Sequence, residues 1–186
     1  MGQVALLAQY GLYVPCGKAR IGLSNYLHIL VGDGQNVQRG LSSFGSEMEE
    51  LREILDNAVD RSLILIDEIA SGTNPTEGLA LTKSFIGYFA DKPYITVLTT
   101  HFDHATVGEH IVNLQVRGLS GADFDRLYRE IAHANRRERI EIIAKYTDYR
   151  LMQIDRLDQV PREALNIAKM LGVYPEIIDD AKRYMA

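Results

Sequence analysis

Two adjacent carboxylates, Asp67 and Glu68, follow a run of four large aliphatic residues at positions 63–66. Such a run is typical of a strand that is buried on both faces of a parallel sheet, and ligands of these sheets bind just beyond the carboxyl ends of the strands. Carboxylates at this place can hold magnesium and orient an attacking water, as they do in nucleotide hydrolases. Because the motif is also common in ordinary strands, it predicts a nucleotide site only together with further residues.

A histidine follows the next predicted strand, residues 94–99, which is rich in β-branched side chains. A helix pattern with a strong start signal fills residues 75–90 between the two strands. A strand, a helix and a strand with short joints predict two parallel strands. We therefore expect Asp67, Glu68 and His101 at one edge of the sheet, where the histidine can hydrogen-bond a terminal phosphate. A purely structural histidine is the alternative.

Small hydroxyl residues stand at the start of a predicted amphipathic helix. Apolar residues recur at helical spacing through positions 43–58, and Ser42 and Ser43 precede or begin this pattern. The unpaired amide hydrogens and the macrodipole of a helix N-terminus favour phosphate. Serines at this place are also ordinary N-caps. The residues alone leave both interpretations open.

A nucleotide site of this plan also needs a phosphate cradle of the form G-x-x-x-x-G-K-[ST]. A similar run departs from the pattern in three ways: Gly11 and Gly17 are one residue too far apart, Ala19 lacks the hydroxyl that would bind magnesium, and no helix is expected to follow. Lys18 is therefore expected to be an ordinary surface lysine. We expect the true cradle upstream of Met1.

The composition indicates an ordinary globular protein. With 186 residues, of which 46% are hydrophobic and 24% charged, the chain is long enough for one full domain and a short appendage. No stretch approaches the roughly 18 apolar residues of a membrane helix, and the single cysteine, Cys16, fits a reducing, cytoplasmic setting. The net charge of −5 argues against a dominant nucleic-acid-binding surface, although the basic cluster at 136–139 is either a solvated helix face or a phosphate patch.

The remaining segments alternate between helix and strand patterns. Residues 1–10 have the pattern of a helix end that Gly11 stops. The further expected elements are extended segments or short strands at 12–15, 18–23 and 26–31, strands at 111–116 and 149–154, and helices at 123–144, 161–171 and 175–184. Together these elements predict an α/β fold.

Four motifs occur in a specific order and spacing. They are SSFGSEM at 42–48, LILIDE at 63–68, SGTNPTEG at 71–78 and TTH at 99–101. In this arrangement the chain resembles the ATPase domain of the MutS family of ABC-type ATPases over most of residues 1–118. The resemblance implies a P-loop NTPase fold with a mixed sheet flanked by helices. It also implies that residues 1–156 are an ATPase domain truncated before its phosphate loop, and that 157–186 form a helix-turn-helix that supports dimerisation.

In this family, ATP is hydrolysed at two composite sites across a head-to-tail homodimer. The resemblance implies that Asp67 is the Walker B ligand of magnesium and that Glu68 is the general base that positions water. It also implies that His101 is the switch histidine that faces the γ-phosphate. ATP and magnesium are accordingly the expected cofactors.

A second group of residues is implied to serve the site of the partner subunit. Ser42 and Ser43 fall on the signature segment that contacts the partner's ATP, and Gly72 and Thr73 fall on the loop that crosses the dimer interface. The turn at 72–78 looks closer to MutS-like paralogues than to mismatch-repair MutS.

Three functions are open at this point. The first is the ATPase domain of a cytoplasmic MutS-like DNA repair protein, with DNA as its partner and no membrane. The second is a MutS-like reactivase for a cobalamin-dependent aminomutase, whose partner is a metabolic enzyme. The third is a non-catalytic interaction fragment, because a chain without the phosphate loop is expected to be inactive alone.

Overall fold

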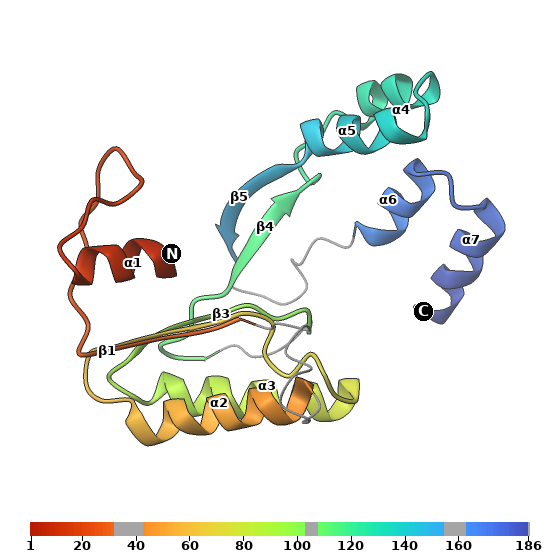
Figure 1. Ribbon diagram of the computed structural model, residues 1–186. Helices are drawn as coiled ribbons and strands as arrows, with labels where there is room; N and C mark the ends of the chain where they lie inside the picture. Colours follow the sequence, from red (N-terminus) through yellow and green to blue (C-terminus); the bar gives the residue numbers. More distant parts are fainter. Residues whose placement is uncertain (32–42, 103–107, 155–162, 186) are drawn as a thin grey trace. The chain divides into compact units, whose positions relative to one another are not determined.

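The computed structural model describes residues 1–31, 43–102, 108–154 and 163–185 (Figure 1). The chain forms two compact units, residues 1–111 and 112–186. Each unit combines helices with strands, so the predicted α/β class is confirmed. Within the described ranges, no helix is long and apolar enough to cross a membrane.

A three-stranded parallel sheet forms the centre of the first unit. Its strands lie in the order β1 (Tyr26–Leu30), β2 (Ser62–Ile66) and β3 (Ile95–Leu98), and they are in register, so that Ile66 lies beside Leu98. The parallel pairing of β2 and β3 confirms the strand-helix-strand unit predicted from the sequence. The carboxyl ends of the three strands therefore meet at one edge of the sheet.

Helices lie on both faces of this sheet. The helices α2 (Ser43–Asn57) and α3 (Pro75–Ala90) lie on one face, and α1 (Gly2–Gln9) lies on the other (Figure 1). On the α1 side, a Cβ atom added to Gly2 would lie 3.3 Å from Leu65 Cδ1. Strand β2 is thus buried on both faces, as its aliphatic run predicts. The core on the side of α2 and α3 consists of Leu30, Leu51, Ile54, Ile64, Ile66, Ile69, Ala70 and Phe89.

The described part of the second unit consists of two antiparallel strands and the helices α4 to α7. In chain order its elements are β4 (Leu114–Gly118), α4 (Phe124–Ala132), α5 (Arg136–Tyr146), β5 (Asp148–Gln153), α6 (Ala164–Met170) and α7 (Pro175–Tyr184). Strands β4 and β5 pair with each other. Helices α4, α5 and α6 form a core together with Leu119, which directly follows β4. The buried residues of this core are Leu119, Leu127, Ile131, Ile143 and Met170.

The single helix predicted over residues 123–144 is wrong, because the structure has two helices there. Helix α4 ends at Ala132, and the side chain of Asn135 accepts hydrogen bonds from the N–H groups of Arg137 and Glu138. The Glu138 carboxylate in turn accepts a bond from the N–H of Asn135. This capping box begins a new helix because it satisfies backbone groups that have no partner inside the helix. The helical apolar pattern continues across the break and hides it.

Other boundaries also differ from the sequence predictions. Residues 12–15 and 18–23 contain no strand. The described strands form a parallel sheet and a separate antiparallel pair, where the family resemblance implies a mixed sheet. The expected C-terminal helices are both present, although α6 starts at residue 164 and positions 161 and 162 lie outside the described residues. The division of the chain at residue 156 stays a prediction.

Candidate active site

The carboxyl ends of β2 and β3 bring the predicted acid residues to one edge of the sheet. Asp67 directly follows β2, and its backbone N–H donates a hydrogen bond to the carbonyl of Leu30 at the end of β1, over 2.9 Å. On the other side, the N–H of Thr99 donates to the carbonyl of Ile66 over 3.0 Å. The backbone ladder therefore continues one residue past the strands. It fixes the main chain of Asp67 between its two neighbours.

The hydroxyl of Thr99 links both acid residues to the tip of β3. It donates a hydrogen bond to Asp67 Oδ1 over 2.6 Å and accepts one from the backbone N–H of Glu68 over 2.8 Å. A hydroxyl has one proton and two lone pairs, so it can make both bonds at once. Sequence reasoning gives Thr99 no role of its own and names it only within the motif around His101. The position of Thr99 directly after a predicted strand, two residues before His101, is the signal that could have identified it.

The turn after β2 has an unusual backbone. Glu68 and Ala70 both have positive φ angles, 54° and 57°. This left-handed region costs about 1–2 kcal/mol for residues other than glycine and persists only where surrounding contacts hold it. Ile69 and Ala70 are fully buried, whereas the side chains of Asp67 and Glu68 are exposed. The turn thus anchors its apolar residues in the core and presents both carboxylates to solvent.

Glu47 of α2 holds the far end of this turn. Its Oε1 atom accepts a hydrogen bond from the backbone N–H of Ala70 over 2.6 Å. Burial raises the pKa of Glu47, and the charge of Glu50 raises it further, although the bond from Ala70 acts in the opposite direction. Sequence reasoning missed Glu47, because the helix pattern gives an acid no sign that it faces inward.

His101 lies two residues after Thr99, at the same edge of the sheet. Its side chain is exposed, and its ring contacts the ring of Phe102 with 4.2 Å between the centroids. Phe102 in turn lies against α3, where a Cβ atom added to Gly78 would come within 2.6 Å of Phe102 Cζ. Among the described residues, no hydrogen bond or ion pair joins His101 to the two acids. In the described part of the chain, the contact that positions the histidine ring is its packing on Phe102.

The other predicted site residues lie in adjoining segments. Gly72 is exposed and Thr73 is half-buried, and both belong to the loop between β2 and α3. The side chain of Asn74 ends this loop by accepting a hydrogen bond from the N–H of Thr76 over 2.9 Å, as predicted for a helix cap. Ser43 is the first residue of α2. Ser42 lies outside the described residues.

The exposed carboxylates suit a hard cation that keeps most of its water. The described residues contain no group of three or more histidine, cysteine, aspartate or glutamate side chains that could enclose a metal ion. Magnesium does not need such a cage, because it commonly binds through one or two carboxylates and completes its octahedron with water and phosphate oxygens. The donor set at Asp67 fits that mode of binding.

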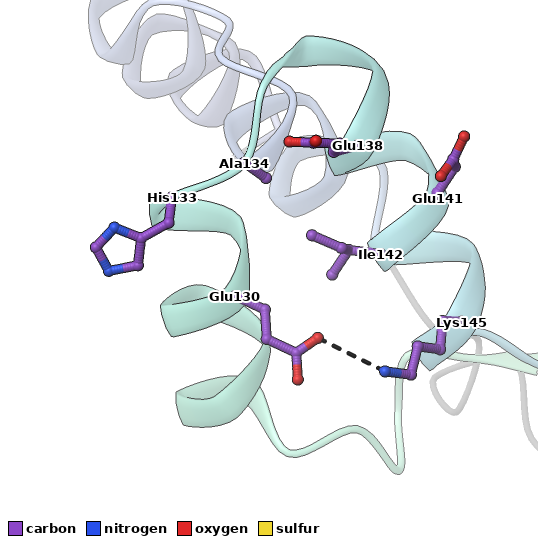
Figure 2. Close-up of a pocket in the computed structure, with 7 residues that line it drawn as sticks. All are labelled: Glu130, His133, Ala134, Glu138, Glu141, Ile142 and Lys145. Carbon is purple, nitrogen blue, oxygen red and sulfur yellow. Dashed lines mark ion pairs between the residues drawn. The ribbon is translucent and has the colours of Figure 1, made fainter.

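A hollow in the second unit is a weaker candidate for a site (Figure 2). Its acids already have partners: Glu130 accepts a hydrogen bond from the Tyr146 hydroxyl over 2.8 Å and one from Arg126 Nε over 3.2 Å, and its Oε2 lies 3.8 Å from Lys145 Nζ. These contacts lower the pKa of Glu130, with the bond from Tyr146 as the largest cause. The hollow is lined by Glu130, His133, Ala134, Glu138, Glu141, Ile142 and Lys145. We therefore interpret these residues as a structural contact between α4 and α5.

Comparison with known proteins places the chain in a family. A family model described as MutS domain V matches residues 1–186. DNA mismatch repair protein MutS of Chlamydia pneumoniae is 33% identical over 172 residues, which are 87% of this chain and 21% of that protein. DNA mismatch repair protein MSH3 of Debaryomyces hansenii is 31% identical over 184 residues, 96% of this chain and 17% of that protein. Endonuclease MutS2 of Pelotomaculum thermopropionicum is 37% identical over 120 residues, 62% of this chain and 15% of that protein.

The chain spans about a fifth or less of the length of these relatives. Because the domain model matches every residue from 1 to 186, the chain belongs to the MutS family.

Proposed function

We propose that this chain is the ATP-binding and ATP-hydrolysing domain of a MutS-like DNA repair protein that acts as a dimer with composite sites. The observation that carries the proposal is the link from the Thr99 hydroxyl to the Asp67 carboxylate and to the backbone N–H of Glu68. It orients one exposed carboxylate, and holds the main chain that carries a second, at the carboxyl edge of a parallel sheet. Ligands of open α/β sheets bind at this edge. The names of the relatives, two DNA mismatch repair proteins and an endonuclease, support a role on DNA.

Each residue of the edge has a proposed task. The Asp67 carboxylate, oriented by the Thr99 hydroxyl, binds magnesium, which neutralises charge on the phosphates when it is present. The exposed carboxylate of Glu68 orients the attacking water and accepts its proton. His101, which follows β3, donates a hydrogen bond to the terminal phosphate of ATP. These roles use the solvent-facing side chains and leave the buried part of the turn as a rigid support.

The partner subunit is proposed to complete the site. Ser42 and Ser43 contact the partner's ATP, and Gly72 and Thr73 lie at the dimer interface. Residues 157–186 pack against the partner as a helix-turn-helix. The exposure of large apolar side chains on this segment, among them Tyr174 (72%) and Ile177 (58%), supports a role in packing.

ATP hydrolysis by the full-length protein that carries this chain tests the proposal. We expect magnesium-dependent turnover that Glu68→Ala lowers by about 10²–10⁴-fold, the usual contribution of a general base. Glu49→Ala is the matched control, because Glu49 is an exposed acid on α2 away from the sheet edge. Full activity in Glu68→Ala would refute the assigned role.

DNA dependence tests the repair assignment separately. We expect DNA to change the hydrolysis rate of the full-length protein and to bind it in a salt-dependent manner. A rate that responds to no form of DNA would instead favour an ATPase that remodels a protein partner, such as the reactivase of a cobalamin-dependent aminomutase. Absence of hydrolysis under all conditions would favour a non-catalytic interaction module.

A further inference from the structure

Glu47 connects the start of α2 with the turn that follows β2. Its Oε1 atom accepts a hydrogen bond from the backbone N–H of Ala70 over 2.6 Å. Glu47 lies about one helical turn after Ser43, and Ala70 lies two residues after Glu68. One carboxylate therefore joins the two segments to which the proposed function gives different tasks, contact with the partner's ATP and activation of water.

The turn that carries Glu68 is held by three hydrogen bonds from its backbone. Glu68 and Ala70 adopt a left-handed backbone conformation, which residues other than glycine keep only when neighbouring groups hold them. Thr99 accepts two of them, from the N–H of Glu68 to its hydroxyl and from the N–H of Ile69 to its carbonyl, and Glu47 accepts the third from the N–H of Ala70. The exposed side chain of Glu68 extends from this turn. Its direction therefore depends on the bond to α2 as well as on the two bonds to Thr99.

We infer that Glu47 is a positioning residue that transmits a shift of the α2 start to the Glu68 carboxylate through the amide of Ala70. The inference deepens the proposed function and rests on it for the catalytic consequence. Ala70 is 0% exposed. Because water cannot replace the lost acceptor there, a shift of Glu47 must either move the turn or leave a buried N–H without a partner.

The hydrogen bond between Glu47 and Ala70 is partly shielded from solvent. The side chain is half-buried, and burial is the largest cause of its raised pKa. A partly desolvated carboxylate is stabilised by each hydrogen bond that it accepts. Glutamine keeps an accepting oxygen at the same place and removes the charge. Glu47→Gln is therefore the conservative variant that separates the hydrogen bond from the charge.

Amide hydrogen exchange of the 186-residue chain tests the bond without any reference to ATP. In Glu47→Ala we expect the Ala70 amide to exchange about tenfold faster or more, as for the loss of one hydrogen bond to a charged acceptor. Glu47→Gln and the exposed control Glu49→Ala should keep the protection of the parent chain. If Glu47→Ala does not fold, Glu47→Asp serves instead, because its shorter side chain cannot span the same distance. Unchanged protection of Ala70 in the folded variant would overturn the inference.

Steady-state kinetics of the full-length protein test the positioning role. We expect Glu47→Ala to lower kcat for ATP hydrolysis about tenfold or more with little change in KM, and Glu47→Gln to retain kcat. A wild-type kcat in Glu47→Ala, with the parent protein active, would refute the positioning role. If exchange of Ala70 responds but the parent protein hydrolyses no ATP, the proposed function fails while the bond between α2 and the turn stands.

Discussion

The hydroxyl oxygen of Thr99 lies 2.6 Å from Asp67 Oδ1 and joins the end of β3 to the end of β2. Two backbone bonds also join these segments, from the N–H of Thr99 to the carbonyl of Ile66 and from the N–H of Ile69 to the carbonyl of Thr99. The side chain of Thr99 adds a connection to the carboxylate itself. The orientation of Asp67 therefore depends on its neighbouring strand as well as on its own backbone.

Replacing Thr99 by valine should disturb this connection while keeping the shape of the side chain. We expect Thr99→Val to lower the free energy of unfolding by about 0.5–1.5 kcal/mol for each hydrogen bond lost, and Thr99→Ser to stay near the parent. Thr96→Val is a control on the same strand, because Thr96 Oγ1 is buried without a hydrogen-bond partner among the described residues. It should be neutral or stabilising. Urea unfolding of the chain measures all three, and equal losses for Thr99→Val and Thr96→Val would contradict the argument.

Gly78 should be needed where α3 approaches the segment after β3. A Cβ atom there would meet Phe102 Cζ at 2.6 Å and the Ala70 carbonyl oxygen at 2.9 Å. Alanine in a helix normally stabilises relative to glycine by about 1 kcal/mol, but Gly78→Ala should destabilise by about 1–3 kcal/mol through overpacking. Gly87→Ala on the same helix meets no atom within 4 Å and should stabilise. Urea unfolding compares them, and a stabilised Gly78→Ala would show that Phe102 moves freely.

The parts of the fold that the sequence predicts correctly depend on local signals. Strand β2 has its aliphatic run, and α3 has Asn74 as its cap and Pro75 as its first residue. Asp67 and Thr99 lie at the same edge because each directly follows one of two parallel strands. Adjacent strand ends are thus the part of the site that sequence reasoning can locate.

Contacts between distant segments are the part that the sequence does not reveal. Glu47 and Ala70 are 23 residues apart. Their hydrogen bond depends on the packing of α2 against the sheet, which no residue spacing in the sequence indicates. The break before Asn135 was missed for another reason. The cap signal was present, but the apolar periodicity on both sides outweighed it.

Gly118 should be needed at the end of β4. Its φ angle is +59°, and a Cβ atom would collide with the carboxylate of Glu163, whose Oε1 accepts a hydrogen bond from the N–H of Leu119 over 2.7 Å. We expect Gly118→Ala to destabilise by more than about 1–2 kcal/mol, the cost of the left-handed backbone alone. Gly121→Ala, which meets no atom within 4 Å, should change stability little. Thermal unfolding measures both variants, and equal midpoints would contradict the proposed contact.

Acid should weaken the start of β5 through Asp148. The side chain of Arg150, which donates to both carboxylate oxygens over 2.9 and 3.1 Å through Nε, lowers the pKa of Asp148 from 3.8 to about 2. A lowered pKa in the folded state contributes stability that is complete above pH 3.8 and is lost as the pH falls through about 2. Carboxyl titration by NMR should show the Asp148 pKa rising toward 3.8 in Arg150→Gln.

The free energy of unfolding of Asp148→Asn should depend less on pH between about 2 and 3.8 than that of the parent chain. Asp56→Asn is the control, because it removes an exposed ion pair on α2 and should leave this pH dependence unchanged. An unchanged Asp148 titration in Arg150→Gln would show that the guanidinium is not the cause.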